Sequence, residues 1–330
     1  MLSDDPKSDR KTSQNGPPHF PFEEPPFRLS MGLVKIITEE WFEIFDLQER
    51  GFQMNEKIRL LANQHDDIFM ATPSSSAAST ETLNLMLKHL PSTRPDLYER
   101  NRETIRLKSH SNFQEKEWST NLKKNTMHPL DLAARLVQED LIIMLPPDSK
   151  KYQTSKGWWL AAGSVAFPSR WSLKEKFNQP MDIIHTLVPF YKEQIQTTVN
   201  NFFDQMPRDE IYARRNWSLY DNSSLRHDGT EQPNKITVKK IDSNNAGEHL
   251  WLRVERQTIR KLKKTGAILF TIRIHLRQLK HIVSFDGIAS RLSKALSALP
   301  PEMQSYKQTD VFADSAQAYL NKFQILEKGG

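Results

Sequence analysis

Two segments in the last third of the chain alternate apolar and polar side chains with a period of two, the pattern of a β-strand with two different faces. They are "HLWLRVERQ" (249–257) and "GAILFTIRIHL" (266–276). One side of the first segment consists of Trp251, Arg253, Glu255 and Gln257, and the other of Leu250, Leu252, Val254 and Arg256. Such amphipathic strands constrain the chain to a sheet whose two faces meet different surroundings.

Charged residues fall on both sides of these strands. Arg256 shares its side with apolar residues, where a guanidinium must be paired with a carboxylate or another anion. In the second segment, Thr271, Arg273 and His275 lie on the side opposite Phe270, Ile272 and Ile274. The polar sides of the two strands are therefore candidates for the wall of a ligand site, although a solvent-facing sheet surface has the same pattern.

Three earlier segments also resemble strands, and helical segments surround all five. The earlier strands are expected at "LIIML" (141–145), "GWWLAAGSVAF" (157–167) and "RRNWSLY" (214–220). Helices are expected after Thr38 in "EEWFEIF", in "NEKIRLLANQ" and "TETLNLMLKHL", which flank the loop "ATPSSSAAS", and from Pro129 onward. This succession predicts an α+β fold with a largely antiparallel sheet.

The domain organisation follows from composition. Residues 1–27 are rich in proline, and we expect a disordered leader there. Residues 28–330 are expected to form a single α+β domain, in which the polar stretch 222–248 is a flexible insert. No apolar run reaches the length of a membrane span, and the polar N-terminus does not resemble a secretory signal, so we expect a cytoplasmic protein with no membrane contact.

The chain contains no cysteine, which excludes disulfide scaffolds, cysteine nucleophiles, iron–sulfur clusters and thiolate-ligated haem within this chain. A transition metal would have to use histidine, carboxylate, tyrosine or methionine. There is also no glycine-rich nucleotide motif or familiar hydrolase motif. Any redox chemistry would therefore need electrons from a partner.

The ten histidines show no metal-ligand spacing, but one of them lies in an apolar run. His185 in "MDIIHTLVPFY" is either a hydrogen-bonded core residue or a single axial ligand, since a porphyrin supplies the other four nitrogens. Just before it, "FPSRWSLKEK" interleaves Arg170, Lys174 and Lys176 with Phe167 and Trp171. This mixture suits a large aromatic anion, and it equally suits an amphipathic surface helix.

The formal charge is 46 minus 40, or +6. An excess of this size fits an anionic cofactor, an acidic partner or nucleic acid, and also an ordinary solvated surface. Basic and aromatic residues interleave in "ARRNW" as they do in proteins that bind single-stranded nucleic acid. Nucleic-acid binding is nevertheless disfavoured, because the basic residues are scattered over several elements.

An ordered set of motifs resembles the haem-dependent oxidative N-demethylase family, in its alpha-subunit or stand-alone fungal-like form. The motifs are "HPLDLAARLVQEDLIIML", "AAGSVAFPSRWSLKEK", "IIHTLVP", "RRNW" and "LRVERQTIRKL" followed by "TGAILFTIR". The resemblance extends from about residue 31 to residue 276. It implies a PAS-like haem domain with an antiparallel sheet of about five strands, and a b-type haem ligated by one histidine.

The resemblance also implies an activity and its partners. Well-studied members oxidise a small secondary amine with dioxygen and release formaldehyde and a primary amine. Their electrons come from NADPH through flavin and iron–sulfur groups on partner subunits. The missing cysteines and nucleotide motifs agree with this division of labour, so we expect a small amine substrate and a separate reductase. A homodimer is left open.

The family motifs assign roles to residues of this chain. The motif histidine corresponds to His185, which is therefore the expected iron ligand. Glu255 is the expected catalytic carboxylate, which binds a protonated amine or relays protons. The alternative for Glu255 is a structural ion pair with a neighbouring arginine. Haem contact or propionate pairing is expected for Arg170, Trp171 and Lys176, and a place in the pocket wall for Arg215, Asn216, Trp217, Arg256 and Gln257.

The sequence departs from the family pattern at four of the motif positions. Leu187 replaces a proline, Asn178 a glycine, Lys263 a proline, and Ile274 and His275 stand where an aromatic residue is usual. Two other classes of function remain beside the enzyme. They are a non-catalytic PAS-like module that senses or binds haem or another ligand, and a basic nucleic-acid-binding protein.

Overall fold

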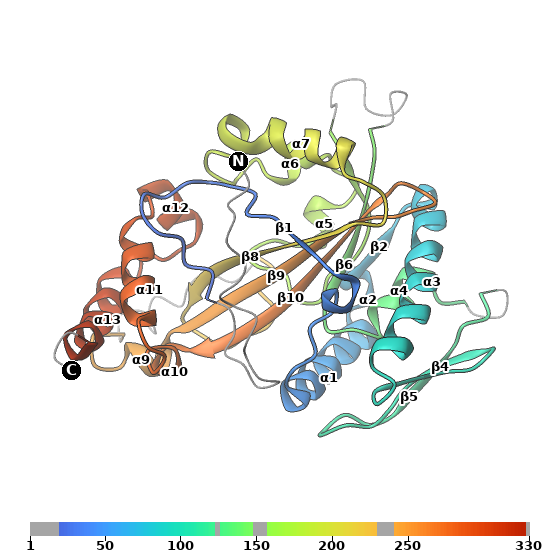
Figure 1. Ribbon diagram of the computed structural model, residues 1–330, viewed down its shortest axis with the longest axis horizontal. Coiled ribbons are helices and arrows are strands. Elements are labelled where there is room, and N and C mark those ends of the chain that lie inside the picture. Colours follow the sequence, from blue (N-terminus) through green and yellow to red (C-terminus); the bar gives the residue numbers. More distant parts are fainter. Residues whose placement is uncertain (1–19, 123–125, 148–156, 230–240, 328–330) are drawn as a thin grey trace.

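The computed structural model of the chain describes residues 20–122, 126–147, 157–229 and 241–327. Its centre is a seven-stranded antiparallel sheet (Figure 1). The strands, in spatial order, are β1 (Val34–Ile36), β8 (Ile211–Tyr220), β9 (Trp251–Lys261), β10 (Ile268–Gln278), β6 (Asp140–Leu145), β7 (Trp159–Ser164) and β2 (Phe69–Ala71). The expected α+β class is confirmed. The sheet has seven strands instead of about five, because two edge strands of three residues are too short to show a period.

A second, three-stranded sheet was not expected from the sequence. It consists of β3 (Tyr98–Arg100), β4 (Thr104–Leu107) and β5 (Lys116–Ser119). Its strands are short, and the outer strand β5 is mostly exposed, so the apolar alternation that reveals a strand is weak there. In Figure 1 this sheet projects from the end of the molecule near α1 and α3.

The helices lie on both faces and at one end of the large sheet. They are α1 (Leu47–Asn63), α2 (His65–Ile68), α3 (Ser76–Thr93), α4 (Pro129–Ala134), α5 (Leu173–Lys176), α6 (Met181–Ile184), α7 (Gln196–Gln205), α9 (Ala246–His249), α10 (Leu279–Ile282), α11 (Ile288–Ser297), α12 (Pro301–Tyr306) and α13 (Ala313–Glu327). Short 3-10 helices occur at Thr38–Glu40 and Pro73–Ser75, and a π-helix at Tyr191–Ile195. Within the described ranges, no helix is both long and apolar enough to cross a membrane.

The expected helix after Thr38 is wrong. Only one 3-10 turn forms there, and the first long helix begins at Leu47, where the Asp46 carboxylate accepts hydrogen bonds from the backbone N–H groups of Gln48 (2.8 Å) and Glu49 (3.0 Å). Trp41 is fully buried in this irregular stretch, so the burial of its side chain, and not the local helix propensity, determines the conformation of the segment. Similarly, α3 begins at Ser76, within the predicted loop.

The register of β9 and β10 decides which polar residues can meet. Glu255 lies opposite Ile274, and Arg256 lies opposite Arg273. The alternation within each strand is as predicted, but the polar sides of the two strands lie on opposite faces of the sheet. We call these faces the Glu255 face and the Arg256 face.

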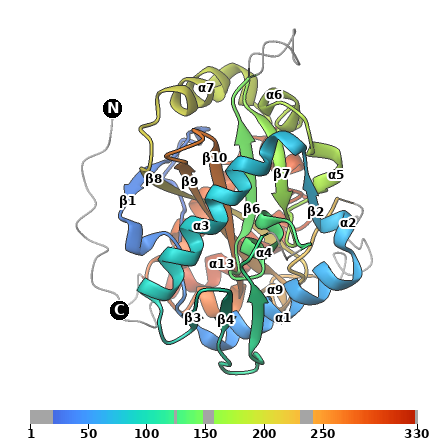
Figure 2. The ribbon, with the colours of Figure 1, turned by 90° about the vertical axis from the view of Figure 1, so that its right-hand side faces the viewer.

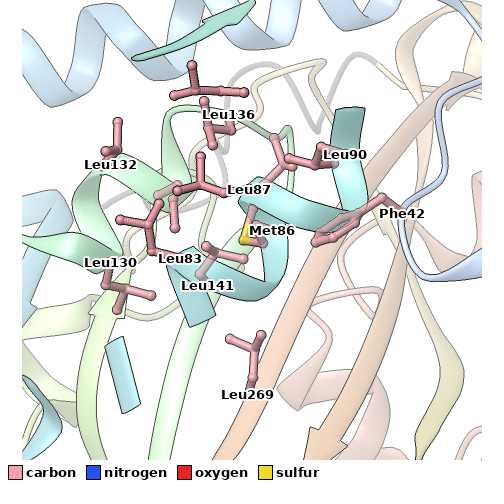
Figure 3. Close-up of a cluster of buried hydrophobic side chains, with 14 of the residues drawn as sticks. Phe42, Leu83, Met86, Leu87, Leu90, Leu130, Leu132, Leu136, Leu141 and Leu269 are labelled. Atoms are coloured by element: carbon pink, nitrogen blue, oxygen red, sulfur yellow. The ribbon is translucent and has the colours of Figure 1, made fainter. Parts of the chain in front are cut away.

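Each face is covered by its own core. The Glu255 face packs through Ile272 and Ile274 against residues of α5, α6 and α7. The Arg256 face packs at one end against α3 and α4, where Leu83 and Leu130 lie near Leu141 of β6 (Figure 3); Figure 2 shows α3 running diagonally across the strands. At the other end of the sheet it packs against α10, α11 and α13.

The described part of the predicted leader is packed against this body. Phe22 is buried, and its ring meets that of Trp217 edge-on at 5.2 Å. Arg291 of α11 donates a hydrogen bond of 3.2 Å to the carbonyl of Phe20. Residues 1–19 of the leader, and residues 230–240 of the predicted insert, lie outside the described residues. At the described end of the insert, His227 is buried and pairs with Ser169.

Candidate functional site

His185 directly follows α6, and its ring is held from two sides. Its Nδ1 lies 2.9 Å from the carbonyl oxygen of Met181, and its ring stacks on that of Tyr191 at 4.4 Å with 12° between the planes. Because a carbonyl can only accept, Nδ1 carries the proton and the lone pair is on Nε2. In the part of the chain that the structure describes, Nε2 has no hydrogen-bond partner.

The environment of His185 keeps its imidazole neutral. Burial lowers the pKa of His185 to about 4, and the positive charges of Lys176 and Arg214 lower it further, against the hydrogen bond to Met181. The helix that carries the ring is anchored to the strand region, because the Met181 N–H donates to the carbonyl of Trp158 at 2.7 Å. The ring is therefore a fixed, neutral imidazole, which is the protonation state that can bind a metal.

Lys176 ends α5, whose first turn is fixed by a reciprocal pair of hydrogen bonds between Ser172 and Glu175, both 3.3 Å long. The Lys176 ammonium lies 4.6 Å from the centre of the Trp171 ring. Burial lowers the pKa of Lys176 to about 8, and the negative charge of Glu255 partly offsets this. Among the described residues, no ion pair or hydrogen bond neutralises this ammonium.

Arg214 is the second cation close to His185. It projects from β8 on the Glu255 face, opposite Gln257. Burial lowers its pKa, and its Nε is buried with no hydrogen-bond partner. Leaving a buried donor unpaired costs free energy. Arg214 and Lys176 are attracted by the charge of Glu255 but have no hydrogen-bond or ion-pair partner among the described residues, so both are suited to bind an anion.

Glu255 is the carboxylate around which the other charges gather. Its Oε2 accepts a hydrogen bond of 3.0 Å from Gln257, and its Oε1 lies 3.6 Å from Arg253 Nε. Its charge also acts on a wider set of cations, which are Arg170, Lys176, Arg214 and Lys307. With five cations around one central carboxylate, the site carries an excess of positive charge.

Two of the groups around Glu255 come from the C-terminal helices and were missed in the sequence. Lys307 follows α12; its Nζ lies 3.3 Å from the Asn216 Oδ1 and also donates to the carbonyl of Trp217. Burial lowers the pKa of Lys307 to about 8 and raises that of Tyr306 to about 12, and the charge of Glu255 raises both. No motif or spacing links these residues to a strand 50 positions earlier in the chain.

Arg170 ties the loop after β7 to the same region. Its backbone adopts the left-handed conformation with φ 60°, and its guanidinium lies 4.0 Å from the centre of the Tyr220 ring. Arg170 donates hydrogen bonds to Gln308 Oε1 (3.0 Å) and to Ser218 Oγ (3.2 Å). Arg170 thus joins the loop, β8 and the segment after α12, which is a positioning role.

The structure brings together most of the predicted site residues. Those on or beside the Glu255 face are Arg170, Trp171, Lys176, His185, Asn216, Glu255 and Gln257. The other three, Arg215, Trp217 and Arg256, project from the Arg256 face, so they do not join this site. Arg214, the neighbour of Arg215, takes the place expected for it.

Arg215 and Arg256 belong to an ion cluster around Glu43. The Glu43 carboxylate lies 2.8 Å from Arg256 Nε, 3.2 Å from Arg215 and 3.2 Å from His275 Nε2. Arg256 also donates to the carbonyl of Trp41 at 2.9 Å. The expectation that Arg256 must be paired is confirmed, and the pair fastens the irregular stretch before α1 to the sheet.

We expect Glu43→Gln to lower the free energy of unfolding by about 3 kcal/mol at pH 7, because it leaves buried cations unpaired. Burial would raise the pKa of Glu43, but the hydrogen bond from His275 and the charge of Arg256 outweigh it and lower the pKa to about 2. The stabilisation by the ionised Glu43 carboxylate is therefore complete above its unfolded pKa of 4.5 and is lost as the pH falls toward 2.

Urea unfolding of the parent and Glu43→Gln at pH 7, 4.5 and 3 measures this difference, with Glu39→Gln, an exposed neighbour, as the control. A gap between parent and variant that stays constant from pH 7 to pH 3 contradicts the assigned role of the Glu43 carboxylate.

Of the four departures from the family pattern, one has a residue on the face of the sheet that carries the candidate site. Asn178 has φ 61°, a left-handed conformation that asparagine tolerates better than most residues, so it can replace a glycine there. Leu187 is 83% exposed, and Lys263 lies exposed in the turn between β9 and β10. His275 projects to the Arg256 face, where it contacts Glu43. Ile274, by contrast, projects to the Glu255 face, directly opposite Glu255.

The fold and the site define an α+β protein in which a neutral histidine lies with cations and aromatic rings beside one face of an antiparallel sheet. Within the described ranges, no group of three or more histidine and acidic residues could hold a bare metal ion. A family model described as haem-dependent oxidative N-demethylase, alpha subunit-like, matches residues 32–317. The chain belongs to this family.

Proposed function

We propose that this protein is a haem-dependent oxidoreductase that oxidatively demethylates a small secondary amine, with His185 as the axial ligand of a b-type haem. The observation that carries the proposal is the geometry of His185. Its Nδ1–H is bound to the Met181 carbonyl, its Nε2 is free among the described residues, and two unneutralised cations lie nearby. A hydrogen bond donated by the ring nitrogen that does not bind the metal is the usual means of orienting a metal-bound histidine.

The chemistry of the donor set fits haem. Lys176 and Arg214 would pair with the propionates, which are carboxylates, and the pairing would remove the cost of leaving two buried cations unpaired. Trp171 and Tyr191 supply ring faces beside Lys176 and His185. Bound haem would supply the site for activating dioxygen with electrons from NADPH, delivered by a reductase that carries flavin and an iron–sulfur group.

Glu255 is the residue that we propose for proton chemistry. Gln257 and Arg253 hold its carboxylate on the face that carries the site, and its side chain remains 12% exposed. A carboxylate there can bind the ammonium form of the amine and accept its proton. The reaction consumes dioxygen, protons and electrons, and releases formaldehyde, a primary amine and water. A PAS-like haem domain in a cytoplasmic protein completes the proposal.

The test is a titration of the purified protein with haem, followed by absorption spectroscopy. We expect a Soret band that saturates at one haem per chain. With an added electron source and dioxygen, the loaded protein is then expected to release formaldehyde from a secondary amine. Failure to take up haem contradicts the whole proposal, whereas haem uptake without formaldehyde from any secondary amine contradicts the enzymatic part.

A further inference from the structure

A pocket lies at the outer edge of β8, beside the candidate site. β1 covers only residues Ile211–Ala213 of β8, so the described chain provides no strand partner for this edge from residue 214 onward. The segment 20–33, blue in Figure 1, passes α12 on its way to β1. Together with β8, α11 and α12 it encloses a pocket, whose walls include Glu23, Phe27, Arg28, Arg214, Met303 and Lys307.

The pocket is lined by more positive than negative charge. Its cations are Arg28, Arg214, Arg215 and Lys307, and its carboxylate is Glu23. Glu43 neutralises Arg215 on the Arg256 face. Arg214 is the cation proposed above for a propionate, so Arg28 and Lys307 remain in the pocket against Glu23. Arg28 and Arg214 have no hydrogen-bond or ion-pair partner in the described ranges, and the Arg214 Nε is buried. The pocket therefore favours an anionic group and repels a ligand that is only a cation.

Three of the pocket residues connect it with the site around His185. Arg214 is close enough to His185 for its charge to lower the pKa of the imidazole. Asn216 is the cross-strand neighbour of Glu255, and Lys307 binds Asn216. A ligand in the pocket would thus reach the region between Glu255 and His185 along residues that both places share.

We propose that this pocket binds the carboxylate of the substrate, and that the substrate is an amine bearing a carboxylate, as an N-methylated amino acid does. The inference rests on the proposed function, because it names the substrate class of that site. Lys307 and Arg28 would bind the carboxylate through charge-assisted hydrogen bonds, while Glu255 receives the ammonium. A simple dialkylammonium ion lacks the group that the cationic wall stabilises.

The test uses sarcosine and dimethylamine as probes for calorimetric titration of the haem-loaded protein. We expect sarcosine to bind about 10-fold or more tightly than dimethylamine, since a hydrogen bond to a charged group is worth that factor. Lys307→Met and Arg28→Met are expected to weaken sarcosine binding about 10-fold and about 3-fold respectively. Lys294→Met, an exposed lysine on α11 outside the pocket, is the matched control.

Equal affinity for the two probes overturns the inference, as does sarcosine binding that is unchanged in both variants. Arg28 is exposed and makes no hydrogen bond in the described chain, so its variant tests the pocket even if the buried Lys307 is needed for folding. Formaldehyde release from dimethylamine but not from sarcosine overturns the substrate class and leaves the proposed function intact. If the protein takes up no haem, the proposed function fails, and sarcosine titration of the haem-free protein still tests the pocket.

Discussion

His185→Ala is expected to lower the affinity for haem by more than about 100-fold, because losing even the partner of a metal ligand costs about 10–100-fold. The variant removes the Nε2 lone pair and the side-chain donor to the Met181 carbonyl, which keeps the backbone N–H of residue 185 as a donor at 3.2 Å. Any residual haem should be held by the cations and aromatic rings alone, with a shifted Soret band. The measurement is a haem titration of parent and variant at equal protein concentration.

The control for this variant is His281→Ala, which removes an exposed imidazole from α10. Since His185 also stacks on Tyr191, urea unfolding of both variants must show that they are folded. His185→Gly with added imidazole provides a further readout, because free imidazole is expected to restore the spectrum of the parent. A parent-like spectrum and affinity in His185→Ala would exclude this histidine as the iron ligand.

The sequence predicted the sides of each strand but not the relation between strands. Alternation correctly separated Glu255 from Arg256, and predicted that Arg256 needs an anion. It did not show that the polar side of β10 faces away from Glu255, because this depends on the register fixed by the turn between the strands. The interpretation of both polar sides as one wall was therefore wrong.

The residues of the site differ in how visible they are in the sequence. The spacing of residues left the role of His185 open, and the resemblance to the family singled it out; the structure adds the bond to Met181 that leaves Nε2 free. Arg214 and Arg215 are adjacent and chemically identical, so only the pairing of β8 with β9 distinguishes them. Lys307 reaches the site through tertiary packing of a distant helix, for which the sequence contains no local signal.

Asp140 has the largest expected effect on stability. It is completely buried at the start of β6, where its carboxylate accepts hydrogen bonds from the backbone N–H groups of Ala166 (2.8 Å) and Phe167 (2.9 Å). The equally buried Lys57 of α1 lies 3.9 Å away. Asp140 thereby holds the loop at Ala166 and Phe167. Arg253, which lies beside Glu255, donates a hydrogen bond of 2.7 Å to the Phe167 carbonyl, so this loop is connected to the site around Glu255.

Asp140→Ala is therefore expected to lower the free energy of unfolding by about 3–5 kcal/mol and to disturb haem binding. It leaves two N–H groups unpaired in the interior and removes the carboxylate beside the Lys57 ammonium, which keeps only the carbonyls of Val137 and Glu139 as acceptors. Asp66→Ala, in which a fully exposed carboxylate is removed, should change the stability by less than about 0.5 kcal/mol. Urea unfolding measures both, and a small loss in Asp140→Ala would contradict the role assigned to the buried carboxylate.

The pH dependence of Asp140→Ala identifies the cause of the loss. Burial lowers the pKa of Lys57 to about 8 in the parent, while the charge of Asp140 acts to raise it. Without Asp140 the pKa of Lys57 in the folded protein must fall further below its unfolded value of 10.5. Folding then opposes protonation of Lys57 over a wider range of pH. The stability gap between parent and variant should therefore widen as the pH falls from 8 to 6. In the background of Lys57→Met the widening caused by the buried amine should disappear, because the amine that titrates is gone. A gap that still widens would trace the pH dependence to another titrating group, such as Asp140 itself, whose pKa is raised by burial.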